Sequence, residues 1–229
     1  MELSQRLTHA LNNNLRWCQT VAELHNIPHE AQASLWRSQQ AMPTFFPNLV
    51  TLSPELTTDE LQNVLPQSGA YFIKDSFATM KLEGDEFIKL FDAQWYCAPA
   101  LLDHGKQQSG IEITEVIDAA QLKQWESLWR GEETFDRIYT NAFLDNKATR
   151  FFTASDGEEI AGITSFYDAQ SIGIYNLWGN ATLLPELISH IKPLYPSSMI
   201  VGYGDEEEVK RLQSVEFEAL APLSVWGRF

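Results

Sequence analysis

The sequence has few cysteines, few basic residues and no long apolar run. Only Cys18 and Cys97 occur, and they lack the close spacing of a metal-binding pair, which favours a reducing compartment. The 16 Lys and Arg residues are outnumbered by 31 Asp and Glu residues, giving a net charge of −15. Such a charge repels the phosphates of nucleic acids and anionic membranes, so we expect neither as a partner. No apolar stretch is long enough to span a bilayer.

The amino terminus lacks the features of a secretory signal. The first six residues, 1–6, contain no basic segment followed by an apolar core. We therefore expect a cytoplasmic protein. Its 229 residues are enough for one large or two modest domains, and 44% hydrophobic with 21% charged residues is typical of a globular protein.

The first hundred residues predict helices followed by strands. Apolar residues from Leu3 to Ile27 recur at helical spacing, and a second helix is expected over residues 30–40. Strands are expected over residues 47–52, 70–75 and 87–96, with a capped helix starting near Thr57 between the first two. This half is therefore predicted to be helical and three-stranded.

Residues 99–110 are rich in polar residues and glycine and indicate a linker. We therefore divide the chain into an N-terminal α/β region, 1–108, and a second domain, 109–229. For the second domain the sequence predicts, in order, a strand at 111–116, a helix capped by Asp118, a helix near 135–143, and strands near 150–154, 160–167 and 173–178. A helix at 183–191, a strand at 199–203, a helix at 205–213 and one or two strands over 217–226 complete it.

This order from Ile111 onward resembles the GNAT superfamily of N-acetyltransferases. The closest matches to its pattern are residues 160–166, residues 173–178, and the late helix and turn at 209–218, with Glu216–Phe217 where the family often has Gly-Phe. The resemblance implies an α/β (α+β) fold with a mixed, largely antiparallel central sheet flanked by helices. It also implies a splayed pair of central strands near Phe166 and Tyr175.

The same resemblance implies transfer of an acyl group from acetyl-CoA, bound as a cosubstrate, to a small-molecule amine. The acidic surface favours a cationic amine. Pantetheine is expected along the backbone of residues 173–178, with the pyrophosphate near residues 179–183. The cofactor-binding candidates are Tyr175, Leu177, Gly179, Asn180, Ala181 and Thr182. The polar candidates for catalysis are Tyr175, Asn176 and Tyr203.

The chain departs from the family pattern at three places. The phosphate loop of the family is glycine-rich, whereas Gly179 is the only glycine between Trp178 and the next helix. The family's tyrosine general acid corresponds to Leu212, and strand 173–178 carries no carboxylate to act as a base. The alternative is therefore a catalytically inactive GNAT-fold module that binds a ligand or another protein.

The strand–helix–strand–strand order of the N-terminal half is similar to part of the second half, and in this the chain resembles tandem GNAT-like proteins with one degenerate copy. Its strands carry apolar residues on both faces. We therefore expect residues 45–98 to pack on the C-terminal domain, with any substrate pocket between them.

Other residue groups have simpler explanations. His25 and His29 have a helical metal-pair spacing, but Pro28 between them disfavours a regular helix, so no metal site is predicted. The acidic run at 205–208 fits a solvated helix N-terminus. Most tryptophans are expected in the core. The candidates for lining a pocket are Trp95, Trp125, Trp129 and Trp178.

Overall fold

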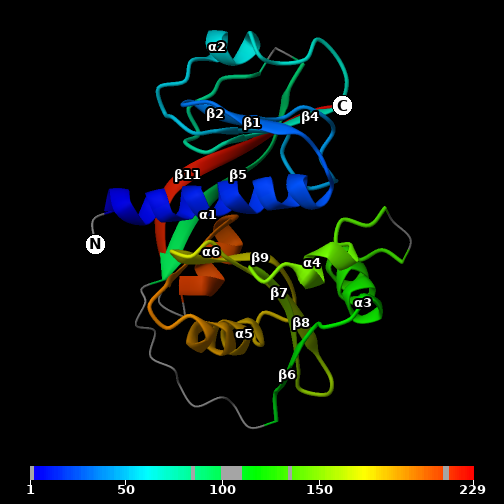
Figure 1. The fold of residues 1–229 in the computed structure, drawn as a ribbon. Helices are drawn as coiled ribbons and strands as arrows, with labels where there is room; N and C mark the ends of the chain where they lie inside the picture. The colour runs from blue at the N-terminus through cyan, green and yellow to red at the C-terminus, as the bar shows by residue number, and fades with distance from the viewer. Residues whose placement is uncertain (1–2, 84–85, 99–109, 134–135, 214–216) are drawn as a thin grey trace. The chain divides into compact units, whose positions relative to one another are not determined.

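A computed structural model describes residues 3–83, 86–98, 110–133, 136–213 and 217–229 (Figure 1). The chain forms two compact units. Unit 1 contains Met1–Tyr96, Tyr203–Glu207 and Ala219–Phe229, and unit 2 contains Cys97–Gly202 and Glu208–Glu218. The last strand of the chain thus belongs to the same unit as the first hundred residues. The expected linker at 99–110 lies almost entirely outside the described residues.

Unit 1 combines one long helix, one short helix and a mixed set of strands. Its elements are α1 (Leu3–Leu24), β1 (His29–Ala31), β2 (Leu35–Ser38), β3 (Leu49–Thr51), α2 (Thr58–Gln62), β4 (Tyr71–Asp75), most of β5 (Ile88–Ala98) and most of β11 (Glu218–Arg228). The strand order is β1-β2-β3-β4-β11-β5. The pair β3–β4 is parallel, whereas β1–β2, β2–β3 and β4–β11 are antiparallel.

The helix expected over residues 30–40 is wrong, because β1 and β2 form a hairpin there. Across this hairpin, the indole Nε1 of Trp36 donates a hydrogen bond to Nδ1 of His29 at 3.1 Å. Strand β2 then pairs with β3, which buries Leu35 and Trp36. Burial of these large side chains in a sheet outweighs the local helical preference. The sequence predicted three N-terminal strands, whereas the described residues before 99 form five, β1 to β5.

Successive residues of β4 point to opposite faces of the unit 1 sheet. Ile73 joins a buried cluster that includes Leu61 of α2 and Trp226 of β11. Lys74 points the other way, and its Nζ donates to Oδ1 of Asn14 on α1 at 2.9 Å. The alternation places α1 and α2 on opposite faces. The short helix α2 begins at the expected cap, where Thr57 and Glu60 form a capping box.

Unit 2 contains most of the elements predicted for the second domain. They are β6 (Glu112–Glu115), α3 (Ala119–Arg130), α4 (Asn141–Asp145), β7 (Thr149–Ser155), β8 (Ile160–Tyr167), β9 (Ser171–Gly179), α5 (Leu184–Ile191), the 3-10 turn η1 (Lys192–Leu194), most of β10 (Met199–Gly204) and most of α6 (Glu206–Gln213). The strand order is β10-β9-β8-β7-β6. The pairs β6–β7, β7–β8 and β8–β9 are antiparallel, and β9–β10 is parallel.

Helices cover both faces of the unit 2 sheet (Figure 1). On β7, the ring of Phe151 lies 5.1 Å from Trp125 of α3, whereas Phe152 lies 5.5 Å from His190 of α5. Because neighbouring strand residues point to opposite faces, α3 and α5 lie on opposite sides. Asp118 caps α3 as expected, accepting hydrogen bonds from the amides of Ala120 and Gln121.

The helix expected near residues 135–143 is largely wrong, since only α4 at its end is helical. Residues 134–135 lie outside the described part of the chain. The amides of Ile138 and Tyr139 donate to the carboxylate of Glu126, at 2.7 and 3.4 Å, instead of to helical carbonyls. A buried carboxylate thus replaces the helical hydrogen-bond pattern.

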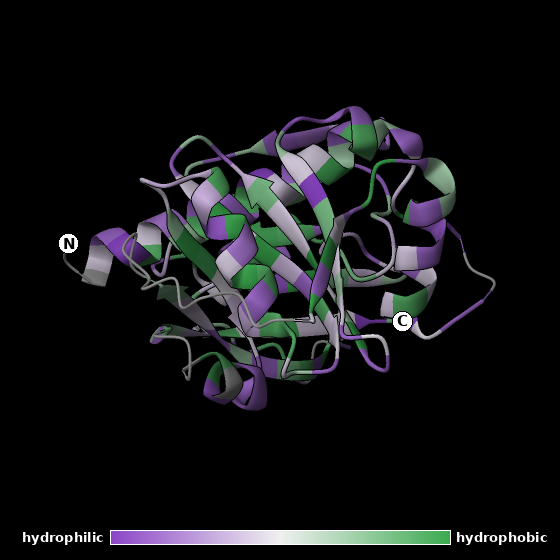
Figure 2. Cartoon of the chain, turned by 90° about the horizontal axis from the view of Figure 1, so that it is seen from below, coloured by the Kyte–Doolittle hydropathy of each residue, from purple (hydrophilic) through white to green (hydrophobic). Residues whose placement is uncertain are grey.

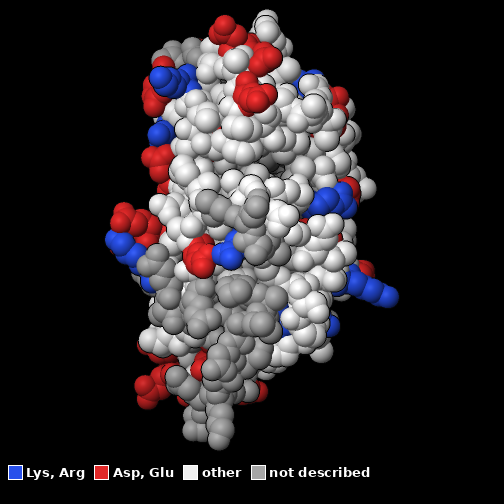
Figure 3. Space-filling view, turned by 90° about the vertical axis from the view of Figure 1, so that its left-hand side faces the viewer, with Lys and Arg blue, Asp and Glu red and all other residues white. Residues whose placement is uncertain are grey.

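The same order of elements occurs in both units. Three antiparallel strands are followed by a helix and then by a strand parallel to the third: β1-β2-β3-α2-β4 in unit 1 and β7-β8-β9-α5-β10 in unit 2. Hydrophobic residues concentrate on the strands, and hydrophilic residues on loops and outer turns (Figure 2). On the face in Figure 3, some acidic and basic side chains lie next to one another, whereas the acidic side chains at the top of the view form a group of their own. No helix in the described ranges is long and apolar enough to cross a membrane.

Candidate functional site

The parallel strands β9 and β10 of unit 2 separate part of the way along their length. They pair through three residue pairs, from Met199↔Ser171 to Val201↔Gly173. Strand β9 nevertheless continues to Gly179, and β10 continues to Gly204. The side of β9 that faced β10 therefore has no strand partner in this register after Gly173. Strand edges of this kind present backbone groups that a ligand can bind.

The expected splay near Phe166 and Tyr175 was assigned to the wrong pair of strands. Strands β8 and β9 stay paired from Tyr167↔Ile172 to Ala161↔Gly179. The separation lies one strand further along, between β9 and β10. The reason is topological: a hairpin links β8 to β9, whereas α5 connects β9 to β10 and allows the two strands to diverge.

A β-bulge lies in β9 beyond the point of separation. Thr164 pairs with Tyr175 and Gly162 pairs with Trp178, so two steps along β8 correspond to three along β9. Within this interval Asn176 has a positive φ of 52°, a conformation that asparagine tolerates better than most residues. The bulge turns the backbone of β9 at its unpaired edge.

A hydrogen-bond network holds the side chain of Asn176. The hydroxyl of Tyr139 donates to Oδ1 of Asn176 at 2.7 Å. Tyr139 is itself fully buried, and its position is fixed through Glu126, a carboxylate with no exposed surface. Glu126 accepts from Arg137 Nε at 2.6 Å and from the amides of Ile138 and Tyr139. The network connects α3 to the bulge.

Two aromatic residues beside the bulge are directed into the protein. Tyr175 is 5% exposed. The indole of Trp178 lies over Gly162, where an added Cβ would come within 2.2 Å of it, and its ring is 5.8 Å from Trp125. Trp178 therefore packs between β8 and α3. Trp125 also lines a hollow of about 180 Å³ together with Thr114, Gln121 and Leu128.

The turn from β9 to α5 uses most of its amides internally. The amides of Asn180, Thr182 and Leu183 donate to Ile160 O, Asn180 Oδ1 and Asn180 O, at 3.0, 2.9 and 3.1 Å. Pro185 supplies no amide, and Glu186 places an acidic residue in the first turn of α5. A phosphate at this turn would thus meet fewer free donors than at a glycine-rich loop.

Gly179 gives the turn a conformation that other residues tolerate poorly. Its φ is +83°, and an added Cβ would lie 2.2 Å from the carbonyl oxygen of Ile160. We expect Gly179→Ala to destabilise unit 2 by about 2–4 kcal/mol through strain and clash. Gly157 is the matched control, because its φ is +96° with no atom within 4 Å. Gly157→Ala should cost only about 1–2 kcal/mol, and equal costs in urea melts would refute the clash.

The corresponding parallel strands of unit 1, β3 and β4, stay connected by hydrogen bonds beyond their last residue pair. Beyond the pair Val50↔Lys74, the hydroxyl of Thr51 accepts from the amide of Ser76 at 2.9 Å and donates to Oδ1 of Asp75 at 3.4 Å. Asp75 is completely buried and also accepts from the amide of Met80 at 2.7 Å. The following helix α2 has its first turn capped by Thr57 and carries Asp59 and Glu60 there.

The structure brings together only some of the residues that the sequence suggested. Tyr175, Asn176 and Leu177 share the bulged segment of β9, and Gly179 to Thr182 form the turn after it. Tyr203 belongs to unit 1, where its ring lies 5.4 Å from Trp95 and 3.9 Å from Nζ of Lys74. Glu216 lies outside the described residues.

Sequence reasoning missed Tyr139 and Glu126. Both lie on apolar stretches that were interpreted only as helix faces. A glutamate flanked by tryptophans at 125 and 129 is a usable signal, because a carboxylate in such surroundings needs hydrogen-bond donors. As for metals, the described residues contain no group of three or more His, Cys, Asp and Glu residues suited to an ion. His29 Nδ1 instead accepts from Trp36.

The fold is that of the GCN5-related N-acetyltransferases, the GNAT fold. A GCN5-related N-acetyltransferase from Kribbella flavida superposes with a TM-score of 0.57 over 93% of this chain and 94% of its own, at 9% identity. A protein from Novosphingobium aromaticivorans assigned to the GNAT family of acetyltransferases gives 0.55 over 93% and 96%, also at 9% identity.

A further structural neighbour has no known function. A conserved protein from Staphylococcus epidermidis, described as functionally unknown, superposes with a TM-score of 0.63 over 89% of this chain and 94% of its own, at 7% identity. No protein-family model and no curated protein matches the sequence. Because the identities are only 7% and 9%, these likenesses establish the fold alone. The superpositions cover 89% to 93% of this chain and therefore include both units.

Proposed function

We propose that unit 2 binds an acyl-CoA along the unpaired edge of β9 and transfers its acyl group to a small-molecule amine. The observation that carries the proposal is the separation of β9 from β10 after Gly173, with a bulge at Asn176. An extended pantetheine chain can add to such an edge as a strand does, with backbone groups of residues 174–178 as its partners. The proposed cofactor contacts are Tyr175, Leu177, Gly179, Asn180, Ala181 and Thr182.

The turn after β9 would limit how the pyrophosphate is held. Ala181 has an amide without a hydrogen bond in the described part of the chain, whereas the amides of Asn180, Thr182 and Leu183 are used. The hydroxyl of Thr182 also donates to Asn180 Oδ1, at 2.9 Å. We therefore expect the affinity for CoA to depend more on pantetheine contacts than on the phosphates.

In the proposed reaction an amine nitrogen attacks the thioester carbonyl, the C–S bond breaks, and the CoA thiol leaves. The attacking amine must arrive neutral, so an ammonium substrate first gives one proton to solvent water. After the C–N bond forms, the nitrogen loses a second proton and the departing thiolate takes one up, both through solvent water. Of the two polar candidates on β9, Tyr175 is buried and Asn176 is half-buried, so Asn176 is the side chain proposed to act near the reacting end. Asn176 is already oriented by Tyr139, so it can position the acyl carbonyl without further ordering.

A pair of substitutions at Asn176 tests this arrangement. Asn176→Gly and Asn176→Val both remove the acceptor for Tyr139, but only glycine readily keeps a φ of 52°. We expect Asn176→Gly to retain acetyl-CoA affinity within about threefold and Asn176→Val to lose about tenfold or more, a difference of roughly 1.4 kcal/mol per decade. Calorimetric titration of the full chain gives both values.

The outcome of that titration is decisive in either direction. Equal affinities for the two variants would show that the bulge does not shape the site. Absence of acetyl-CoA binding by the unsubstituted chain would refute the proposal. A circular-dichroism melt of each variant verifies that the fold is retained at the titration temperature.

A second candidate function is a GNAT-fold module that binds an acyl-CoA or another partner without catalysis. The observation that favours it is the turn at 180–183, in which the amides of Asn180, Thr182 and Leu183 are occupied, together with Leu212 in place of the acid tyrosine. An assay of CoA thiol release with a panel of primary amines separates the two. Binding without release beyond the hydrolysis background would favour the non-catalytic module.

We also propose that unit 1 is a degenerate copy of the same domain. The recurring strand and helix order supports this, and full-length coverage by the structural neighbours is compatible with it. In unit 1, hydrogen bonds of Thr51 with Asp75 and Ser76 hold the parallel strands β3 and β4 together, and α2 has an acidic first turn. The copy would therefore retain the fold without an acyl-CoA site.

A further inference from the structure

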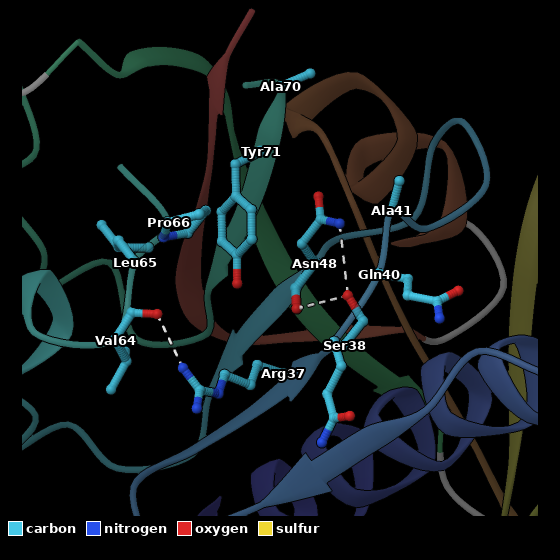
Figure 4. A pocket seen from close by; sticks show the side chains of 11 residues that line it. Arg37, Ser38, Gln40, Ala41, Asn48, Val64, Leu65, Pro66, Ala70 and Tyr71 are labelled. Atoms are coloured by element: carbon cyan, nitrogen blue, oxygen red, sulfur yellow. Dashed lines mark hydrogen bonds between the residues drawn. The ribbon is translucent and has the colours of Figure 1, made fainter. Parts of the chain in front are cut away.

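Unit 1 contains a cavity of about 490 Å³ at one end of its sheet (Figure 4). Its walls come from the end of β2, from Asn48 just before β3, from the segment after α2, and from the start of β4. All of its lining residues belong to unit 1. A cavity of this volume is in the range that accommodates small molecules.

Tyr71 places an unsatisfied hydroxyl in this cavity. The residue is only 8% exposed, and its hydroxyl has no hydrogen-bond partner in the described part of the chain. Figure 4 shows the hydroxyl pointing into the space between Val64, Arg37 and Asn48. Burial raises the pKa of the phenol, while the nearby Arg37 and Arg228 oppose that rise. The hydroxyl therefore stays protonated at neutral pH and is a hydrogen-bond donor to a ligand.

Arg37 brings a fixed guanidinium to the same cavity. Its Nε donates to Oε1 of Glu30 at 2.7 Å, and its Nη1 donates to the carbonyl of Val64 at 2.9 Å. These bonds hold the side chain in place and leave Nη2 without a partner in the described part of the chain. A planar, prepositioned guanidinium edge suits a carboxylate.

The local charge around Tyr71 is more positive than that of the chain as a whole. Arg228 donates through Nε to Gly69 O at 3.0 Å and through Nη2 to Pro66 O at 2.8 Å. Both carbonyls belong to the segment that forms one wall of the cavity. The charged groups in these contacts are therefore two arginines and one carboxylate, Glu30, in a chain of net charge −15. An anion is favoured here by the balance of charge.

The cavity is polar on one side and apolar on the other. Ser38 and Asn48 form the polar wall, where the amide nitrogen of Asn48 lies 3.5 Å from Ser38 Oγ. The opposite wall is apolar and consists of Val64, Leu65, Pro66 and Ala70. Such a site accommodates a ligand with one charged end and one hydrocarbon part.

We propose that this cavity is a binding site for a small organic carboxylate. The carboxylate meets the hydroxyl of Tyr71 and the guanidinium of Arg37, and the hydrocarbon part lies against Val64, Leu65 and Pro66. The site lies in unit 1, so it goes beyond the acyl-CoA function proposed for β9 and does not depend on it.

The test compares 4-phenylbutanoate with its neutral analogue 4-phenylbutanamide, using ¹⁵N-labelled full-length chain. The carboxylate should shift the amide resonances of Gln40, Val64 and Tyr71 saturably, and the neutral amide should bind at least about tenfold more weakly. The proposal would be overturned if the shifts did not saturate by about 10 mM 4-phenylbutanoate, or if the two probes bound with equal affinity.

Tyr71→Phe isolates the hydroxyl. The substitution removes a hydroxyl that faces the cavity and makes no hydrogen bond within the described part of the chain, so the melting temperature should not fall. Affinity for 4-phenylbutanoate should drop about tenfold. Tyr167→Phe is the control, because it removes a hydroxyl from unit 2 that donates to Ala169 O at 3.3 Å, and it should leave the affinity unchanged. Unchanged affinity in Tyr71→Phe, or a substantial loss of stability, would contradict the assignment.

Discussion

Replacing Glu126 by alanine is expected to destabilise unit 2 by about 3–5 kcal/mol. The Glu126 carboxylate is completely buried and accepts from Arg137 Nε at 2.6 Å and from the Ile138 amide at 2.7 Å. Its removal leaves a guanidinium and two amide donors without their acceptor. The amide of Tyr139 also donates to Glu126, so the substitution should loosen Tyr139 and the hydrogen bond from its hydroxyl to Asn176.

Urea unfolding of the full chain measures this effect. Glu132→Ala is the matched control, since Glu132 is half exposed and pairs with Arg130 at 3.2 Å, and its loss should cost about 0–1 kcal/mol. Glu126→Gln keeps the shape but loses the charge, so an intermediate cost is expected. A cost below about 1 kcal/mol for Glu126→Ala would show that the network contributes little.

Replacing Trp226 by alanine is expected to destabilise unit 1 by about 3–5 kcal/mol. Trp226 lies on β11 and is 1% exposed, and it packs in the cluster that contains Leu61, Ile73 and Phe87. Strand β11 pairs with β4 through five residue pairs, including Trp226↔Ile73. The carboxyl-terminal strand is thus part of the core of unit 1.

Thermal unfolding followed by calorimetry tests this assignment. Phe229→Ala is the control, because Phe229 is 79% exposed, and its substitution should change stability by less than about 0.5 kcal/mol. A fragment that ends at residue 217 should lose the same transition that Trp226→Ala lowers. An unchanged melting profile in Trp226→Ala would contradict the placement of β11 in that core.

Local sequence signals predicted much of unit 2. The strand predicted near residues 160–167 and the helix cap predicted at Asp118 each depend on a few neighbouring residues, so β8 and the start of α3 were recognisable. The order of these elements was enough to suggest the GNAT fold, which the structure shows.

The elements that were predicted incorrectly depend on partners distant in sequence. Residues 29–38 form a hairpin whose second strand, β2, pairs with β3, and the amides of Ile138 and Tyr139 donate to Glu126 instead of to helical carbonyls. Chain connectivity alone did not reveal that β11 pairs with β4. The bulge at Asn176 was likewise invisible, because its extra residue is defined only against β8. Tertiary context decides such features.

The most direct test of the proposed acyl-CoA site is hydrogen exchange of the full chain with and without saturating acetyl-CoA. Within residues 174–178, the amides that face away from β8 should exchange at least about tenfold more slowly with the ligand, since a bound pantetheine supplies the hydrogen-bond partners that these amides lack. The corresponding strand β3 of unit 1, Leu49–Thr51, should show no change because its neighbour β4 is already bonded to it. Unchanged exchange at 174–178, or equal protection of both strands, would contradict an acyl-CoA site on β9.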